Sequence, residues 1–255
     1  MDLSELQLFL ETKAAFYNQS WFVESDPIVV PHAFTKKEDV EIAAFLTATM
    51  AWGQRKMIVA KARQLMAWMD DAPHDFVTLA GDRELQRLSQ FVYRTFNGVD
   101  CQYFVAALGE LYRKGGGLEG VFTQGYRKGG SVWSSLTWFR EQFMAFEPMA
   151  RTGKHVANVL KGSSAKRLNM FLRWMVRTEG PVDFGLWKGI PPAALQIPLD
   201  VHVGRVAREL GLLQRKQDDR KAVEELTAVL KTFRPHDPVF YDYALFGLGV
   251  FEKRS

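Results

Sequence analysis

Cysteine is nearly absent from this chain, in which Cys101 is the only one among 255 residues. A single thiol cannot form an intrachain disulfide, a cysteine-based zinc site or an iron–sulfur cluster. The histidines lie far apart in the sequence and show none of the short spacings that metal ligands have. We therefore expect no metal, no cofactor and a reducing compartment.

Long apolar runs are missing as well. The longest, residues 43–52, is interrupted by threonines and is too short to span a bilayer. The first residues, MDLSELQLFLE, are acidic and helix-like, and they lack the basic segment and apolar core of a signal peptide. The sequence thus predicts a cytoplasmic protein with neither a targeting segment nor a membrane partner.

Acidic residues are absent between Arg151 and Thr178. The same stretch holds seven basic residues, namely Arg151, Lys154, Lys161, Lys166, Arg167, Arg173 and Arg177. One interpretation is a solvated helix face, and the other is a surface that an anionic partner neutralises. The net charge of +4 and the pI near 9.1 suit such a partner without requiring one.

Apolar residues recur at helical spacing along most of the chain, and no stretch alternates as a strand would. The hydrophobic content of 47% is ample for a packed core. We expect an all-α fold with helices over residues 2–16, 39–51, 55–69, 100–112, 132–146, 166–177, 200–210, 220–233 and 237–248. Glycine and proline favour loops at 125–130 and 179–198.

Three of these helices carry more specific predictions. The helix over 39–51 is apolar on most sides, as is typical of a helix buried in a bundle. Asp237 and Pro238 are typical of the cap and first residue of the last helix. The spacing in the 166–177 helix turns its apolar residues inward and leaves four polar residues outside, namely Lys166, Asn169, Arg173 and Arg177.

A short turn, LKGSSAKRLN, precedes the helix that begins at Lys166. The backbone N–H groups of Gly162, Ser163 and Ser164 in such a turn can bind phosphate, although most turns of this kind are ordinary capped loops. The primary amine of Lys166 is either a nucleophile for a sugar carbon or a lysine that contacts phosphate or solvent. Spacing alone favours the second interpretation.

Asp200 follows Ile197, Pro198 and Leu199 and precedes an amphipathic helix, which is the position of an N-cap. A cap and a catalytic role are compatible. Helix N–H groups hold such a carboxylate in one direction, from which it can stabilise positive charge that develops on a sugar.

Four segments, in the same order along the chain, resemble the helix-hairpin-helix DNA glycosylases. LKGSSAKRLNMFL is similar to the hairpin pattern LPGVGxKTAxxxL, and Leu160, Gly162 and Lys166 fall on its leucine, first glycine and catalytic lysine. IPLDVHVGRVARELGL resembles VDTHVxRVxxRLGL and places Asp200 on the catalytic aspartate. AAFLTATMAWGQRK is similar to the LLSxQTxD helix and turn, and YDYALFGLGV is similar to the closing FNxALMDLGA helix of MutY-type members.

The chain departs from this pattern in three ways. Ser164 replaces the second hairpin glycine, residues 179–198 lengthen the spacing between the lysine and the aspartate, and the cluster cysteines are absent. The sequence is therefore most similar to cluster-free members of the archaeal type, which excise 8-oxoguanine and have AP lyase activity. It also resembles an uncharacterised bacterial family of glycosylase-like proteins.

The resemblance implies a two-lobed architecture without an iron–sulfur cluster. Residues 37–178 would form a helical-bundle lobe that ends in the hairpin, and residues 1–36 with 179–255 a second lobe that carries Asp200. The implied function is that of a monomeric DNA glycosylase and AP lyase in base excision repair, associated with the nucleoid. Its implied partner is double-stranded DNA with a damaged base, 8-oxoguanine above all.

The resemblance also assigns roles to residues. Lys166 and Asp200 would be catalytic, although a shifted hairpin register would transfer the lysine's role to Lys161 or Lys154. The implied DNA contacts are Lys154, Lys161, Gly162, Ser163, Ser164, Arg167, Gln54 and Arg55. Gln54 or Arg55 would fill the gap left by the flipped base, or either is an ordinary polar residue at a helix junction. The implied base pocket is formed by Trp52, Trp174 and Trp187, although tryptophans at helical spacing are more often core residues.

Two other hypotheses remain open. The chain is compatible with a non-catalytic protein that binds structured DNA or RNA on a glycosylase-like fold. It is also compatible with a helical interaction protein that has no nucleic-acid partner. Salt-dependent binding that survives loss of Lys166 and Asp200 would indicate the first, and no binding at low salt would indicate the second.

Overall fold

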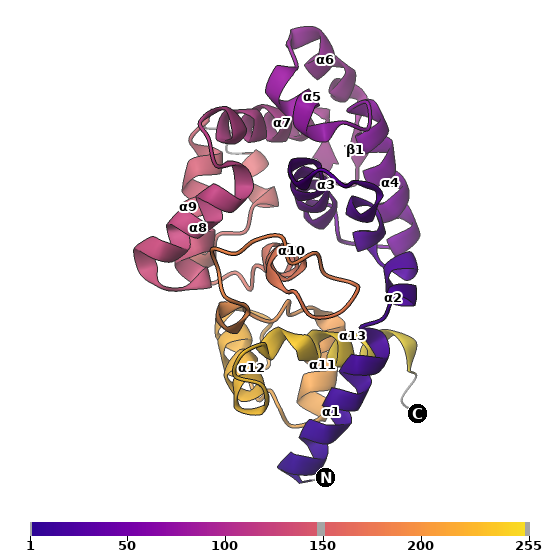
Figure 1. The fold of residues 1–255 in the computed structure, drawn as a ribbon, viewed down its shortest axis with the longest axis vertical. Helices are drawn as coiled ribbons and strands as arrows, with labels where there is room; N and C mark the ends of the chain where they lie inside the picture. Colours follow the sequence, from indigo (N-terminus) through magenta and orange to yellow (C-terminus); the bar gives the residue numbers. More distant parts are fainter. Residues whose placement is uncertain (1, 147–150, 253–255) are drawn as a thin grey trace. The chain divides into compact units, whose positions relative to one another are not determined.

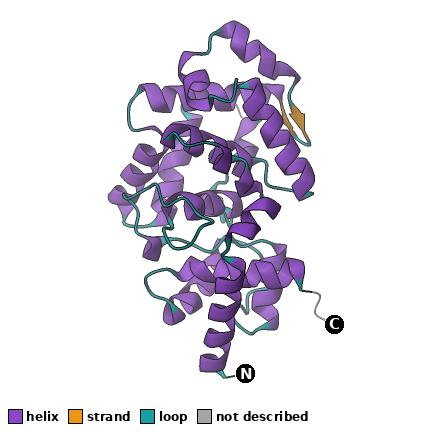
Figure 2. Cartoon of the chain, turned by 45° about the vertical axis from the view of Figure 1, so that its right-hand side comes forward, coloured by secondary structure: helices purple, strands orange, loops and turns teal. Residues whose placement is uncertain are grey.

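The computed structural model describes residues 2–146 and 151–252, and helices dominate them, which confirms the all-α prediction (Figure 1, Figure 2). The only sheet in this part of the chain is an antiparallel hairpin of β1 (Val92–Tyr93) and β2 (Phe96–Asn97). None of the described helices is both long enough and apolar enough to cross a membrane. The chain divides into a middle unit, Ser25–Ala157, and a terminal unit that combines Met1–Glu24 with Asn158–Ser255.

The middle unit packs around one buried helix, α3 (Lys37–Thr49). All residues from Val40 to Thr49 are buried, as the apolar sequence predicts. The ring of Phe45 lies 5.4 Å from that of Phe139 and 5.8 Å from that of Phe104. The other helices of this unit are α4 (Arg55–Trp68), α5 (Pro73–Leu79), α6 (Asp82–Arg87), α7 (Gly98–Arg113), α8 (Gly117–Gly129) and α9 (Val132–Met144), with 3-10 turns at Pro27–Val29, Pro31–Ala33, Leu88–Gln90 and Thr152–His155.

The loop expected at 125–130 is wrong, because residues up to Gly129 belong to helix α8. Gly125 lies against α9, where an added Cβ would come within 2.6 Å of Cβ of Trp138 and 2.9 Å of Cα of Ser135. This glycine therefore permits close packing of two helices and does not form a turn. Only Gly130, with φ of 66°, ends the helix in the left-handed conformation typical of a C-cap.

The terminal unit combines segments from both ends of the sequence. Its elements are α1 (Leu3–Tyr17), most of α2 (Ser20–Ser25), α10 (Lys166–Val176), α11 (Val201–Glu209), α12 (Arg220–Phe233) and α13 (Asp242–Phe251), with 3-10 turns at Val159–Lys161, Pro192–Ala194 and Pro238–Tyr241. Helix α1 packs on α13 (Figure 1). Gly247 of α13 leaves room there for the ring of Tyr17. The hydroxyl of Tyr17 donates a hydrogen bond of 2.7 Å to Glu252.

The last helix begins later than Asp237 and Pro238 predict. These residues begin a 3-10 turn, and α13 starts only at Asp242. Asp237 makes no cap hydrogen bond, because its carboxylate is buried and bonded to Arg177. The side chain of Asp237 thus forms an ion pair with Arg177 and does not cap the helix.

The division into units differs from the expected boundary at residue 178. The turn at 162–165 and α10 belong to the terminal unit, which also carries Asp200. Two features explain this grouping. Ser163 forms a β-bridge with Asp219, and the amide of Arg220 donates a 3.0 Å hydrogen bond to the carbonyl of Gly162. The far end of α10 is tied to the segment 179–198, whose Phe184 and Trp187 amides donate to the carbonyls of Trp174 and Met175.

Candidate active site

Lys166 is the first residue of α10 and follows a tightly held turn. Gly162 and Ala165 both have left-handed backbone, with φ of 83° and 49°. Glycine adopts this conformation freely, whereas alanine does so at a cost of about 1 kcal/mol. The hydroxyl of Ser163 accepts a 3.2 Å hydrogen bond from the amide of Ala165, and the bridge to Asp219 holds the turn from outside. The position from which Lys166 leaves the backbone is therefore fixed.

Most amides of this turn are used within the chain. Those of Gly162 and Ser163 donate to the carbonyls of Val159 and Asn158, and that of Ala165 donates to Ser163. Asn169, expected outside, is 1% exposed and donates a 3.0 Å hydrogen bond from its side-chain amide to the carbonyl of Ser164. The expected phosphate-binding amides of the turn are thus reduced to that of Ser164.

Asp200 caps α11, as its position in the sequence predicts. One carboxylate oxygen, Oδ1, accepts 2.9 Å hydrogen bonds from the amides of both His202 and Val203. Two donors on one oxygen fix the rotation of the carboxylate and leave Oδ2 to face elsewhere.

The second oxygen of Asp200 faces Lys166. The ammonium nitrogen of Lys166 lies 3.7 Å from Oδ2, and the two side chains are 29% and 12% exposed. The distance is that of an ion pair, and the exposed fractions show that both side chains keep partial access to solvent. A primary amine and an oriented carboxylate are therefore adjacent within one unit. They are the two groups that the resemblance to the glycosylases assigns to catalysis.

The two alternative lysines are placed differently. Lys161 is exposed and lies on the other side of the turn, at the end of the Val159–Lys161 3-10 turn. Lys154 is exposed and belongs to the middle unit. Of the three lysines, Lys166 is thus the one whose ammonium the structure places at ion-pair distance from Asp200.

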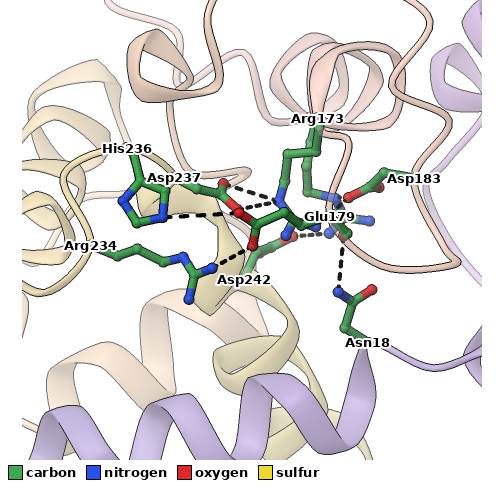
Figure 3. Close-up of polar contacts among 9 residues, drawn as sticks. Asn18, Arg173, Glu179, Asp183, Arg234, His236, Asp237 and Asp242 are labelled. Carbon is green, nitrogen blue, oxygen red and sulfur yellow. Dashed lines mark hydrogen bonds and ion pairs between the residues drawn. The ribbon is translucent and has the colours of Figure 1, made fainter.

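Arg173 and Arg177 are buried, so the expectation that they face solvent is wrong. They are 4% and 0% exposed. Nε of Arg177 donates to both oxygens of Asp237, at 3.0 and 2.9 Å, and Nη1 donates to Asp183 at 2.7 Å. Arg173 pairs with Asp183 at 3.3 Å and with Asp242 (Figure 3). Helical spacing alone placed these arginines outside, but three aspartates from other segments neutralise them.

Two groups of this cluster have shifted pKa values. Burial opposes the charge of Arg177, but Asp183 and Asp237 outweigh burial and raise the pKa of its guanidinium. For Asp242, burial raises the pKa to about 7 against the opposing effect of Arg173, and the charge of Asp200 adds to the rise. The negative charge of Asp200 thus contributes to the raised pKa of Asp242.

A second set of polar contacts involves Glu179, which begins the 179–198 segment. Arg234 pairs with the carboxylate of Glu179, which His236 approaches at 4.0 Å. Asn18 donates a 3.2 Å hydrogen bond to the carbonyl of Glu179 (Figure 3). These contacts attach the start of the 179–198 segment to the rest of the terminal unit.

The basic stretch of 151–178 is largely compensated by acids from elsewhere in the chain. Arg151 pairs with buried Asp100 at 2.9 Å, Lys166 with Asp200, and Arg173 and Arg177 with the three aspartates above. Burial lowers the pKa of Arg167, which is partly covered. An anionic partner is thus not needed to neutralise the whole stretch. Lys154 and Lys161 are exposed, as is Arg151, which pairs with Asp100.

Trp174 and Trp187 belong to the hydrophobic core, with exposures of 0% and 1%. The ring of Trp187 packs at 5.3 Å against Phe171. A base could not stack on either ring without opening the core, so the expected pocket role is wrong for both and the core interpretation is confirmed. Trp52 is half-buried in the middle unit, where its ring lies 5.3 Å from Tyr93 and 6.2 Å from His155.

Two expected DNA contacts, Gln54 and Arg55, follow Trp52 in the chain. Gln54 is exposed and precedes α4 as its N-cap without a side-chain cap bond, and Arg55 begins the helix. These residues and Lys154 belong to the middle unit, whereas Lys161, Gly162, Ser163, Ser164, Arg167, Lys166 and Asp200 belong to the terminal unit. No three His, Cys, Asp or Glu side chains gather as metal ligands would within the described residues.

Sequence reasoning missed the carboxylates that surround α10. Asp183 lies in the irregular 179–198 segment, and Asp242 starts the last helix, so neither had a pattern that indicated its partner. One signal was available. Seven basic residues without an acid between them are unusual for a solvated surface, which indicates that acids from other segments neutralise some of them. The structure shows these acids as buried aspartates.

Comparison with known proteins identifies a family. The family model described as "Protein of unknown function (DUF2400)" matches residues 26–251. The match covers most of the chain, and the chain belongs to this family. No curated protein and no solved structure matches it. The match includes both Lys166 and Asp200.

Proposed function

We propose that this member of the DUF2400 family is a bifunctional DNA glycosylase and AP lyase that excises a damaged base, with 8-oxoguanine as the favoured lesion. The observation that carries the proposal is the position of the Lys166 ammonium, 3.7 Å from an oxygen of Asp200 whose partner oxygen is fixed by two helix amides. The ordered resemblance along the chain supports the same pair. In this proposal the 162–165 turn and α10 are a degenerate hairpin and its second helix, since a 3-10 turn replaces the first helix.

The proposed chemistry uses the two groups in sequence. Asp200 accepts a proton from the ammonium of Lys166, and the free amine attacks the anomeric carbon of the flipped nucleotide. The bond between sugar and base breaks, the base leaves with its electron pair, and it takes up the proton that Asp200 received, so that Asp200 is a carboxylate again. Opening of the sugar ring then gives a Schiff base on Lys166. Loss of a proton from the neighbouring sugar carbon expels the 3′ phosphate.

Asp200 suits a second task in the same reaction. Positive charge develops on the sugar as the base departs, and a carboxylate in a fixed orientation stabilises that charge without reorganising. The cap on α11 supplies this orientation, because both amide donors bind Oδ1 and leave Oδ2 toward Lys166. The cap and the catalytic role thus use different oxygens of one residue.

The proposed DNA contacts come from both units. Lys161, the amide of Ser164 and the partly covered Arg167 would bind phosphate beside Lys166. Gln54 and Arg55 would enter the base stack, and Lys154 would bind phosphate from the middle unit. Such contacts give affinity without sequence information, as a search for rare lesions requires.

The proposal is tested by incubating the protein with duplex oligonucleotides that each carry one lesion, including 8-oxoguanine and an abasic site. We expect base release from at least one lesion and strand cleavage at the abasic site. Lys166→Gln should abolish both. Lys114→Gln is the control that should retain them, because Lys114 is an exposed lysine that pairs with Glu110 of α7. Salt-dependent binding without base release or cleavage in wild-type protein would contradict the proposal and favour a non-catalytic nucleic-acid-binding protein.

A further inference from the structure

The turn that carries Gln54 and Arg55 is held from two sides within the middle unit. On one side is the β1–β2 hairpin, whose loop is Arg94–Thr95. On the other side is the 3-10 turn Thr152–His155. The Trp52 ring lies between them, 5.3 Å from the ring of Tyr93 and stacked at 24° on His155.

The hairpin side makes a direct bond to the turn. The hydroxyl of Tyr93 donates a hydrogen bond to the backbone carbonyl of Trp52. A bond to a carbonyl restrains the backbone itself, whereas ring packing restrains only a side chain. Tyr93 is 4% exposed, so water does not compete freely for this bond.

Arg94 closes over the next residue of the turn. Gly53 has φ of 101°, and an added Cβ would lie 2.6 Å from Nη2 of Arg94, so the guanidinium occupies the space that a side chain would fill. Arg94 itself has φ of 53°, a conformation that non-glycine residues rarely adopt. Strain of this kind persists where the surroundings over-determine the backbone. The guanidinium of Arg94 thus packs directly over the backbone of Gly53.

The opposite side rests on a buried polar cluster. His155 lies 3.2 Å from a carboxylate oxygen of Asp100, which is fully buried. Thr152 and Arg151 donate to the same carboxylate at 3.0 and 2.9 Å. Arg151 also reaches the carbonyl of Thr95 at 3.4 Å and so links this cluster to the hairpin loop.

We infer that Tyr93 and Arg94 are positioning residues that hold the Trp52–Arg55 turn ready to enter a base stack during base extrusion. The inference rests on the proposed function. A group that fills the space of an extruded base must be presented in one geometry, because ordering a mobile turn at that moment would oppose extrusion. Gln54 meets this requirement: its carbonyl accepts from the amides of Met57 and Ile58 and fixes its backbone, while its exposed side chain makes no cap bond.

The test compares Tyr93→Phe with Tyr103→Phe. Both changes remove only a hydroxyl, and that of Tyr103 donates a 3.0 Å hydrogen bond to the carbonyl of Phe143, a buried contact of the same unit. Base release from a duplex lesion is measured under single-turnover conditions, with 2-aminopurine beside the lesion to report unstacking. The same variants are trapped with borohydride on a duplex whose abasic site is already formed.

We expect Tyr93→Phe to slow unstacking and base release about five-fold, the effect of one lost hydrogen bond. Trapping at the preformed abasic site should change less than about two-fold, because no base remains to be extruded. Tyr103→Phe should leave both rates unchanged. Gly53→Ala, which displaces Arg94, should repeat the pattern of Tyr93→Phe. A merely structural role would lower base release and trapping together.

Three results would overturn the inference. The first is base release at the wild-type rate in Tyr93→Phe, and the second is trapping slowed as much as base release in that variant. Either result removes the positioning role while the proposed function stands. If wild-type protein neither releases a base nor is trapped, the proposed function fails and the extrusion role fails with it. Activity of the wild-type protein therefore distinguishes the two failures.

Discussion

Nζ of Lys166 lies 3.7 Å from Oδ2 of Asp200, while Oδ1 of the same carboxylate accepts two amide hydrogen bonds at the start of α11. The lysine begins one helix and the aspartate precedes another. Each position is fixed by local structure, the lysine by a strained turn and the aspartate by its cap. The pair is therefore preorganised by two helix starts.

The cap and the catalytic charge of Asp200 can be separated by substitution. Asn is as good an N-cap as Asp, so Asp200→Asn should change the free energy of unfolding by less than about 0.5 kcal/mol. The same variant loses the carboxylate, and base release should fall about 10²- to 10⁴-fold. Urea unfolding and single-turnover kinetics measure the two effects.

The control is Asp2→Asn, which alters the cap of α1 in the same way and should keep full activity. Asp200→Ala removes both functions and should also cost about 1 kcal/mol of stability. Retention of base release in Asp200→Asn would show that the cap is the only role of this residue.

Arg177→Met tests the buried ion pairs behind α10. The change leaves Asp237 buried without the guanidinium of Arg177 and leaves Asp183 with Arg173 alone. We expect a loss of about 3–5 kcal/mol in the free energy of unfolding. Arg205→Met is the matched control, because Arg205 forms an exposed pair with Glu209 on one helix. It should cost less than about 1 kcal/mol. Equal losses in urea unfolding would mean that the buried cluster adds no stability of its own.

Stability should depend on pH through Asp242. Burial raises the pKa of Asp242 to about 7, so the folded protein holds this proton more tightly than the unfolded chain does. The contribution to stability is complete below the unfolded pKa near 4 and is lost as the pH rises through 7. Relative to wild type, Asp242→Asn should therefore gain stability between pH 4 and pH 8, by about 4 kcal/mol at most.

Asp219→Asn provides a control of opposite sign. The hydrogen bond from Arg215 lowers the pKa of Asp219, so its contribution is present at neutral pH and is lost only in acid. Relative to wild type, this variant should be less stable at neutral pH than in acid. Unfolding free energies for Asp242→Asn that stay parallel to wild type across the pH range would contradict the assignment.

Local patterns predicted most of the longer helices and the cap at Asp200, because both depend on neighbours within a few residues, but they did not predict α2, α5, α6 or α8. They failed where a residue's environment comes from distant segments. The glycine at 125 looked like a turn former, yet it permits contact with Trp138 on the next helix. Arg177 looked exposed, yet its partner Asp237 is sixty positions away in the chain. Helical spacing gives the face of a helix but not what covers that face.

The proximity of Lys166 and Asp200 was predicted only through resemblance to a family. Neither residue had a local signal stronger than that of a phosphate contact or a cap. The support that Tyr93 and Arg94 give to the Trp52 turn had no sequence signal, because it depends on a two-residue hairpin loop meeting a glycine from another segment.

The central claim is that Lys166 forms the covalent bond to DNA. Protein and a duplex with an abasic site are reduced together with borohydride, digested and analysed by mass spectrometry for the residue that carries the sugar. The account predicts one adduct, on Lys166, and none in Lys166→Gln. An adduct on Lys161, Lys154 or another amine, or no adduct at all, would contradict it.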